Sequence, residues 1–407
     1  MVRQQQKEMN MKLNRHNTVW KGYMTGKRLL AAFLGASLLL SGCGPAGGSQ
    51  GAFDASSEEN GKLKVAVTLF PYYDFVRQIA GDQVDLQMVI PAGMDSHSFE
   101  PTPADIRTIQ HADVLISNGG TMEHWLKDTL SALDTSNMTI VTMMDYVDTV
   151  EEEIVEGMED AGHDHDHAHS HAAADDHDHS HETPEEHAAH AQEADDHDHS
   201  HETPEEHAAH AQETDDHDHS DYVDHDGHEE AIEYDEHIWT SPVNAMKLVD
   251  VIGETLAEAD PAHAEVFRQG AADYKKELEE IDAGFREVSR NRKRNMIVMG
   301  DKFPFRYLAD EYQLDYRAAF SGCSSDTEPS AKTIAYLIDK VKEEQIPVVY
   351  YLELSSHRVS EIIGEETGAE PLLLHSCHNV TRAQFDAGIT YAGLMRQNIE
   401  NLRKGID

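Results

Sequence analysis

The chain has 407 residues and a formal net charge of −45, because 77 Asp and Glu residues outnumber 32 Lys and Arg residues. Of the acidic residues, 33 lie between positions 151 and 236, where Lys and Arg do not occur, so the other residues together carry a charge of only −12. Phosphate binding needs clustered basic side chains, and the composition therefore argues against nucleic acid as a partner. The length allows two or three domains.

The first 43 residues predict an export signal. Lys27 and Arg28 precede an apolar run over residues 29–40, which is too short for a transmembrane helix of about 20 residues. The run ends in LSGC, which resembles the lipobox of bacterial lipoproteins, in which the Cys is acylated and becomes the new N-terminus. We therefore expect a lipid anchor at Cys43 on the extracytoplasmic face of a bacterial cell membrane. A secretory signal with a chance Cys is the alternative.

A flexible tether and then an α/β lobe are expected after this signal. Residues 44–61 are small, polar and Gly-rich, which is typical of a tether. The following patterns predict strands at 62–70, 84–90, 114–118 and 138–143 and helices at 73–82, 102–113 and 122–133. Strands that alternate with helices at this pace indicate an α/β fold with a mostly parallel sheet.

An acidic, His-rich segment, residues 151–235, interrupts this alternation. Between positions 162 and 228 it contains 19 of the 28 His residues and almost no large apolar side chain. Residues 175–194 recur at 195–214 with one difference, at the last position. Such a chain cannot bury enough surface to offset its ordering entropy, so we expect disorder. Many flexible imidazoles favour exchangeable binding of metals, and an acidic spacer with incidental His is the alternative.

A second set of elements follows the segment. We expect helices at 241–259 and 261–290. Further on, the patterns predict strands at 296–299, 347–353 and 369–375 and helices at 331–345, 356–367 and 390–402. The helix over 261–290 would be roughly 40 Å long. Its apolar positions are spaced three and four residues apart: Ala264, Phe267, Ala271, Tyr274, Leu278, Ile281, Phe285 and Val288.

These patterns predict two α/β lobes, residues 62–260 and 291–407, joined by one rigid helix. A single larger domain with an internal insertion is the alternative.

Two His residues outside the segment lie in distinctive surroundings. His97 is part of PAGMDSHSFEPTPADI, and His237 is part of DEHIWTSPVNA. The two stretches resemble the G-x-D-x-H-x-x-x-P-T-P-x-D and D-x-H-x-W-x-x-P-x-N-A signatures of the metal-binding solute receptors of zinc and manganese ABC importers, cluster A-I. The resemblance extends from about Leu63 to the C-terminus.

This resemblance implies two α/β lobes joined by a rigid helix, with one metal ion held at the lobe interface. A His-rich loop between the two motifs marks the zinc members of the family, and nitrogen ligands favour zinc over manganese. The chain would then be a monomeric lipoprotein that captures zinc and passes it to a membrane permease, with the His-rich segment as a zinc collector. It would not be an enzyme.

The resemblance also implies the ligands. His97 and His237 match the two ligands of the N-terminal lobe, with a capping or surface role as the alternative. In the C-terminal lobe the family places a His or Glu where Gly300 stands here, so we expect the adjacent Asp301 as third ligand, unless it is a cap or a surface carboxylate. We expect His375 at the position of the last ligand, ordinarily an Asp.

Four further side chains complete these expectations. His378 and Glu353 are reserve ligands. Cys377 could ligate as a thiolate, but we favour a disulfide with Cys323, which an exported chain permits; two free buried thiols are the alternative.

Other functions stay open at this point. They are an extracellular zinc buffer or adhesin that is not coupled to transport, a manganese receptor, and a zinc hydrolase with Glu353 or Asp301 as base.

Overall fold

The computed structural model describes residues 53, 61–158, 233–324 and 328–407, which all belong to one compact unit. The expected signal peptide with Cys43, nearly all of the tether, and the greater part of the His-rich segment lie outside these residues. Within the described ranges, no helix is both long enough and apolar enough to cross a membrane.

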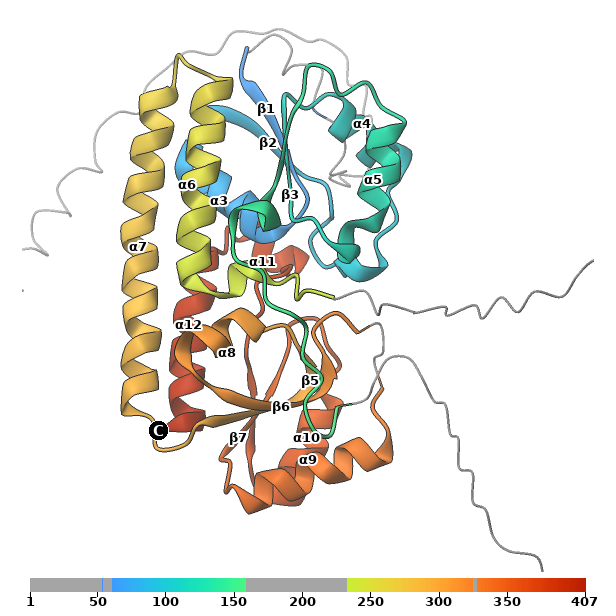
Figure 1. Ribbon diagram of the computed structural model, residues 1–407, viewed down its shortest axis with the longest axis vertical. Helices are drawn as coiled ribbons and strands as arrows, with labels where there is room; N and C mark the ends of the chain where they lie inside the picture. The colour runs from blue at the N-terminus through green and yellow to red at the C-terminus, as the bar shows by residue number, and fades with distance from the viewer. Residues whose placement is uncertain (1–52, 54–60, 159–232, 325–327) are drawn as a thin grey trace, which may run out of the picture. The chain divides into compact units, whose positions relative to one another are not determined.

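The N-terminal lobe is built on a parallel four-stranded sheet in the order β2-β1-β3-β4 (Figure 1). Its strands are β1 (Leu63–Val67), β2 (Val84–Met88), β3 (Val114–Ser117) and β4 (Thr139–Thr142). All four were expected from the sequence. The central strands β1 and β3 are β-branched and apolar, as parallel strands covered on both faces usually are.

Helices connect these strands at the expected places. They are α3 (Phe70–Ala80), α4 (Pro103–Gln110) and α5 (His124–Ser131). α4 begins with a capping box, in which the Thr102 side chain accepts from the backbone N–H of Asp105 and the Asp105 carboxylate accepts from that of Thr102. Thr102 is the N-cap of α4, and Pro103 is its first helical residue, a position that Pro favours.

The C-terminal lobe repeats this plan with the parallel order β6-β5-β7-β8. Its strands are β5 (Met296–Phe303), β6 (Asp315–Ser321), β7 (Val348–Tyr351) and β8 (Glu370–Leu373). Its helices are α8 (Arg306–Tyr312), α9 (Ala331–Glu343), α10 (Arg358–Thr367), α11 (Arg382–Asp386) and α12 (Tyr391–Ile406). β6, α8 and α11 were not expected from the sequence.

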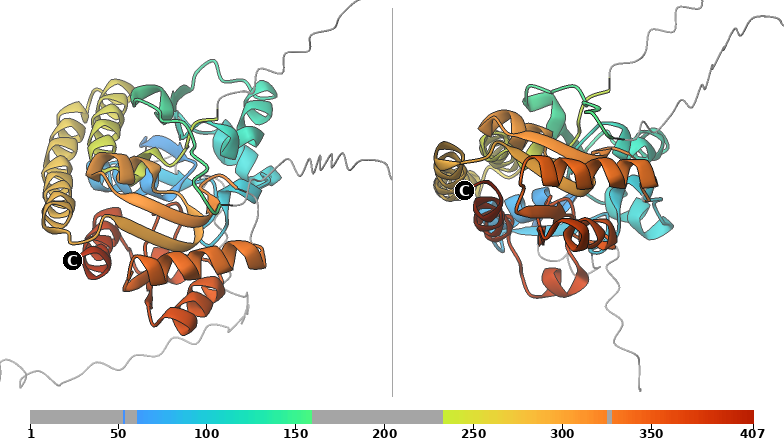
Figure 2. Two further views of the ribbon diagram at one scale, coloured as in Figure 1. Left: turned by 60° about the horizontal axis from the view of Figure 1, so that its bottom comes forward. Right: turned by 90° about the horizontal axis from the view of Figure 1, so that it is seen from below.

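The two faces of this second sheet are covered by different helices. Val298 and Val349 point to the face packed by α9 and α10, whereas Ile297, Met299 and Tyr350 point to the face that joins the main core. Successive strand residues alternate between faces, which explains the split. Figure 2 shows α9 and α10 lying together beside the sheet.

Two long helices, α6 (Pro242–Ala259) and α7 (Ala264–Asn291), pack against each other. α7 contacts α3 of the first lobe and α12 of the second, so it runs past both lobes (Figure 1). The predicted apolar stripe is buried from Phe267 to Val288. Gly270 permits the close approach to α3, because an added Cβ there would lie 2.2 Å from the Ile79 carbonyl oxygen.

Both lobes contribute to one continuous apolar core. The Phe75 ring of α3 meets the Tyr391 ring of α12 edge to face, with 5.0 Å between centroids. Asp74, buried beside it, accepts hydrogen bonds from the backbone N–H of Tyr391 (2.7 Å) and from the Arg77 guanidinium. Aromatic packing and a buried carboxylate therefore hold the lobes together directly, in addition to the long helix.

A connection from the N-terminal lobe also crosses to the C-terminal lobe. Residues 148–158, here called the strap, include the start of the predicted His-rich segment. The strap pairs with the segment's other end, since Glu151 and Tyr234 form an antiparallel bridge. Its Glu152 and Glu153 carboxylates accept from the Cys323 N–H (2.9 Å) and the Tyr316 hydroxyl (3.1 Å). Residues 151–158 and 233–235 thus have defined places on the fold.

Candidate metal centre

Three imidazoles meet where the two lobes face each other: His97 and His237 from the first lobe and His378 from the second. One ring nitrogen from each lies within 4.8 Å of those of the other two. The ring centroids are 5.3 to 5.8 Å apart. Within the described ranges, no other group of three or more His, Cys, Asp or Glu side chains converges in this way.

His97 is presented by a short 3-10 turn, Ser96–Ser98, in the loop that follows β2. The Asp95 carboxylate caps this turn by accepting from the His97 backbone N–H (3.0 Å). The loop leaves the carboxyl end of a parallel strand, where open α/β sheets usually bind their ligands. Burial, and next the positive charge of a protonated His237, lower the pKa of His97 to about 4.

His237 is almost completely buried at the start of a second 3-10 turn, Ile238–Thr240. Asp235 Oδ1 accepts from the His237 backbone N–H (2.8 Å) and lies 3.2 Å from its Nδ1. A carboxylate at Nδ1 fixes the tautomer and leaves Nε2 for a metal ion. Tyr307 of the second lobe donates to the Asp235 carbonyl (2.7 Å), so the placement of His237 depends on both lobes.

His378 belongs to the loop that follows β8, and its ring hydrogen-bonds to the Ser96 hydroxyl across the interface. The loop is anchored by Glu353, whose Oε2 accepts from the Ser376 N–H (2.8 Å). Cys377 adopts a left-handed conformation, φ 61°, which turns the chain between Ser376 and His378. Burial, and next the charges of the other two imidazoles, hold the pKa of His378 well below its usual range.

Trp239 joins the two loops that carry these ligands. Its indole N–H donates to the Ser376 carbonyl (2.8 Å), and its own carbonyl accepts from the Tyr391 hydroxyl (2.7 Å). The indole ring lies 5.6 Å from the His237 ring and 5.3 Å from the His378 ring. A buried side chain of the second sequence motif therefore ties the His237 loop to the His378 loop.

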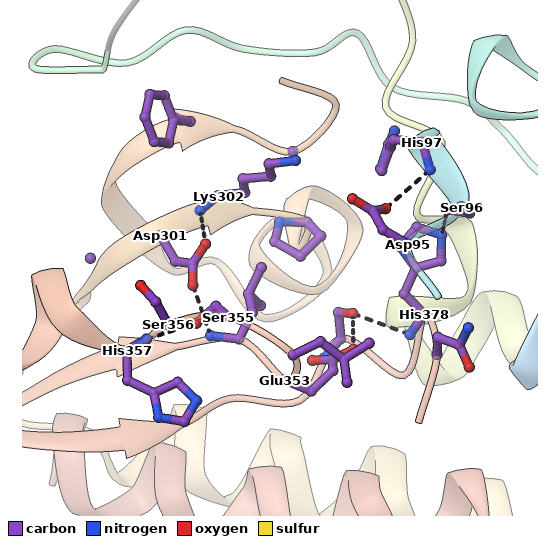
Figure 3. A pocket seen from close by; sticks show the side chains of 18 of the residues that line it. Asp95, Ser96, His97, Asp301, Lys302, Glu353, Ser355, Ser356, His357 and His378 are labelled. Carbon is purple, nitrogen blue, oxygen red and sulfur yellow. Dashed lines mark hydrogen bonds between the residues drawn. The ribbon is translucent and has the colours of Figure 1, made fainter. Parts of the chain in front are cut away.

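The three His residues line a cavity of about 300 Å³ to which both lobes contribute. Figure 3 shows His97 and His378 in its wall. Its second-lobe wall includes Asp301, Lys302, Glu353 and His357. Because burial keeps His97 and His378 neutral near pH 7, their nitrogens are available as ligands without first losing a proton. Three imidazoles that converge in a recess are a donor set suited to zinc.

Comparisons with known proteins identify the family of this chain. The model of the family described as "Zinc-uptake complex component A periplasmic" matches residues 65–405. This chain belongs to that family. The match covers both lobes and all three converging His residues.

Individual relatives of the zinc-uptake family support the assignment. The zinc-binding protein AdcA of Streptococcus pyogenes serotype M18 is 31% identical over 347 residues, 85% of this chain and 56% of its own length. The high-affinity zinc uptake system protein ZnuA of Bacillus subtilis is 26% identical over 91% of this chain and 94% of its own length. The chain spans about half the length of the AdcA relatives it matches.

A solved structure of this family also matches. The Zn(II)-bound ZnuA-like domain of Streptococcus pneumoniae AdcA has a TM-score of 0.58 and 25% identity, covering 85% of this chain and all of that chain. The fold of two α/β lobes with parallel sheets is therefore the fold of the zinc-uptake family.

The structure corrects the expectation for His375, which does not converge with the other imidazoles. It is buried, and its Nδ1 accepts from the Cys377 N–H (3.0 Å). Its backbone N–H and carbonyl both pair with the Asn398 amide, at 2.8 and 2.7 Å. His375 thus builds the turn, and His378, held in reserve at the sequence level, points into the centre.

Asp301 lines the cavity but stands apart from the three imidazoles. Its two oxygens accept from the backbone N–H groups of Lys302 (2.9 Å) and Leu352 (3.3 Å), which tie β5 to the end of β7. A side chain at the neighbouring Gly300 would require Ser360 to move, because an added Cβ would lie 2.5 Å from Ser360 Oγ and 2.8 Å from its backbone nitrogen. At this position the strand packs against α10.

The favoured disulfide is also wrong, because Cys323 and Cys377 are both free thiols. Cys323 follows β6 beside the strap, whereas Cys377 is buried in the turn before His378. Burial raises the pKa of both thiols, so neither is a thiolate near pH 7.

In the sequence, His378 could be noticed only because it and His375 both lie close to Cys377. Their spacing does not predict which of the two rings points into the cavity.

Proposed function

We propose that this protein is an extracytoplasmic receptor that binds one zinc ion through His97, His237 and His378 and delivers it to an ABC-type importer. The convergence of three buried imidazoles from both lobes carries this proposal. Membership of the zinc-uptake family supports it, as do the zinc-binding names of the relatives. The site would hold metal as cargo, and the protein would not be an enzyme.

Zinc is favoured over manganese by the chemistry of the donors. Imidazole nitrogen suits zinc, whereas manganese prefers carboxylate and carbonyl oxygen. Of the nearby carboxylates, Asp235 pairs with His237, and Asp301 and Glu353 accept backbone N–H groups. The oxygen-rich set that manganese would need is therefore absent from the three-imidazole centre of the described residues.

The His-rich segment would serve as a collector that raises the local zinc concentration. The strap supports this role, since Glu152 accepts from Cys323 (2.9 Å). Gly322, which precedes Cys323, lies against His237. A Cβ added to Gly322 would be 3.3 Å from His237 Cε1. The segment's ends are thus held beside the centre. A lipid at Cys43 would keep the receptor, as a monomer, near its permease.

The deciding experiment is zinc titration calorimetry with metal analysis, using the intact protein and a variant without residues 162–228. We expect tight one-to-one binding to persist without the segment, while weaker sites disappear. His97→Ala, His237→Ala and His378→Ala should each abolish tight binding, and His111→Ala, at an exposed position, is the matched control. If tight binding is lost with the segment, the protein is a zinc buffer and the receptor proposal is wrong.

A further inference from the structure

A lysine occupies an unusual place in this centre. Lys302 lies near the end of β5, half-buried, and lines the same cavity as His97, His237 and His378. Figure 3 shows its side chain extending from the second lobe towards the first-lobe loop with Asp95 and His97. Its positive charge acts on two of the imidazoles, since it contributes to the lowered pKa values of His97 and His378.

A cation beside a cation site needs a physical reason. Like charges at close range in a recess of low dielectric repel strongly. Among the described residues, the Lys302 ammonium has neither an ion pair within 4.0 Å nor a hydrogen bond. Without a negative partner, it would weaken binding of a divalent ion at the three imidazoles.

Four carboxylates line the cavity wall: three of them are hydrogen-bonded within the protein, and the fourth, Glu328, is exposed to solvent. Both oxygens of Asp301 accept backbone N–H groups, and both oxygens of Glu353 accept from Ser376. Asp95 uses one oxygen to cap the His97 turn. None of these carboxylates joins the group of three converging imidazoles.

Zinc in a site of three imidazoles has one tetrahedral position left. We propose that a small exogenous monoanion, such as chloride or a monocarboxylate, fills this position and is held by the Lys302 ammonium. This inference rests on the proposed zinc site. The anion would join the two cations, and the cavity of about 300 Å³ has room for it beside the ion. The receptor would then carry zinc as a ternary complex, with affinity that depends on the anion.

Cobalt(II) is the probe for this test, because its visible absorption reports the ligands of a tetrahedral site. The full-length protein receives less than one equivalent of cobalt, and the spectrum of His97→Ala is subtracted to isolate the fixed site. Acetate and chloride are then titrated against a background of a non-coordinating anion. We expect the spectrum to shift and saturate with each anion.

The lysine variants decide the role of Lys302. Lys302→Met should weaken acetate binding about tenfold or more, and Lys302→Arg should stay within about threefold of the parent. Lys332→Met, at an exposed position on α9, is the control and should behave like the parent. Circular dichroism of each variant verifies that it is folded.

Three results would overturn the inference. One is a parent spectrum that does not respond to either anion, and another is an unchanged acetate affinity in Lys302→Met. The third is a cobalt spectrum that changes in Asp95→Asn when neither acetate nor chloride has been added, which would make Asp95 the fourth ligand. If His97→Ala and the parent give the same cobalt spectrum, the three-imidazole site itself, and with it the proposed function, is wrong.

Discussion

The two lobes share one plan but contribute to the centre in different ways. The N-terminal lobe supplies His97 and His237 from motifs in which neighbouring residues also shape the ligand, since Asp95 caps one turn and Asp235 orients the other ring. The C-terminal lobe supplies His378 from a loop held by Glu353 and Asn398, which are distant in sequence. The sequence singled out the two imidazoles with local support as expected ligands, whereas it held His378, whose support is distant in sequence, only in reserve behind His375.

The contrast makes a strong prediction about the two His residues of the C-terminal loop. Replacing His378 by Ala should reduce zinc affinity about 1,000-fold, because a ligand is lost. His375→Ala should retain one-to-one binding and lose at most about tenfold, because it only loosens the turn. Calorimetry on proteins without residues 162–228 measures both. Equal losses, or a larger loss for His375→Ala, would mean that His375 is the ligand after all.

Replacing the carboxylates that support the imidazoles, Asp235 in one lobe and Glu353 in the other, compares how much each lobe's support contributes to zinc affinity. Asp235→Asn should lower zinc affinity about 10- to 100-fold, as is usual when the carboxylate behind a ligating His is lost. Glu353→Gln should cost less, about tenfold at most, because an amide oxygen can still accept from Ser376. Competition with a fluorescent zinc chelator ranks the two variants. The reverse order would show that the C-terminal loop is the more sensitive support.

Proton competition should separate the fixed site from the His-rich segment. Burial lowers the pKa of His97 to about 4, whereas exposed His titrates near about 6.5. Protons therefore compete at the fixed site only at lower pH, and at pH 5.5 we expect one tightly bound zinc to remain while the segment has released its metal. Calorimetric stoichiometry at pH 7.5 and 5.5 checks this. Loss of both classes at the same pH would contradict it.

The same shift links pH to the stability of the metal-free protein. Because the folded pKa of His97 lies below the unfolded value, unfolded chains bind more protons between about pH 6.5 and 4. The free energy of unfolding should therefore fall as the pH falls through this window. Urea unfolding at pH 7 and 5 measures the change, and His97→Gln should show a weaker pH dependence.

The smallest expected effect concerns Gly300 and Asp301, where the family pattern suggested a ligand. Gly300→Ala should cost about 1–3 kcal/mol of unfolding free energy, because its Cβ would clash with Ser360. Urea unfolding measures this cost.

Asp301→Asn should change zinc affinity by less than about threefold, since the Asp301 oxygens only accept backbone N–H groups. Zinc titration measures the affinity. A hundredfold loss of affinity in Asp301→Asn would restore it as a ligand.

The sequence by itself determined the elements whose signals are local. The stripe from Phe267 to Val288 identified α7, because helical periodicity records which face is buried. β6 escaped because the turn before it is made by Gln313 in a left-handed conformation, φ 54°, where Gly is the usual signal. α8 was missed because it has only seven residues and several of them are polar, so it shows little apolar periodicity.

Only the tertiary structure decided which side chains complete the centre. His375 and His378 are three residues apart, and their surroundings differ because Cys377, which lies between them, adopts a left-handed conformation. Asn398 holds His375, and Glu353 holds Ser376. The separation of Cys323 from Cys377, and the contact of Gly300 with Ser360, likewise arise from packing between distant segments. Local patterns record the burial of one element, whereas the direction of a loop side chain depends on partners that come together only in the fold.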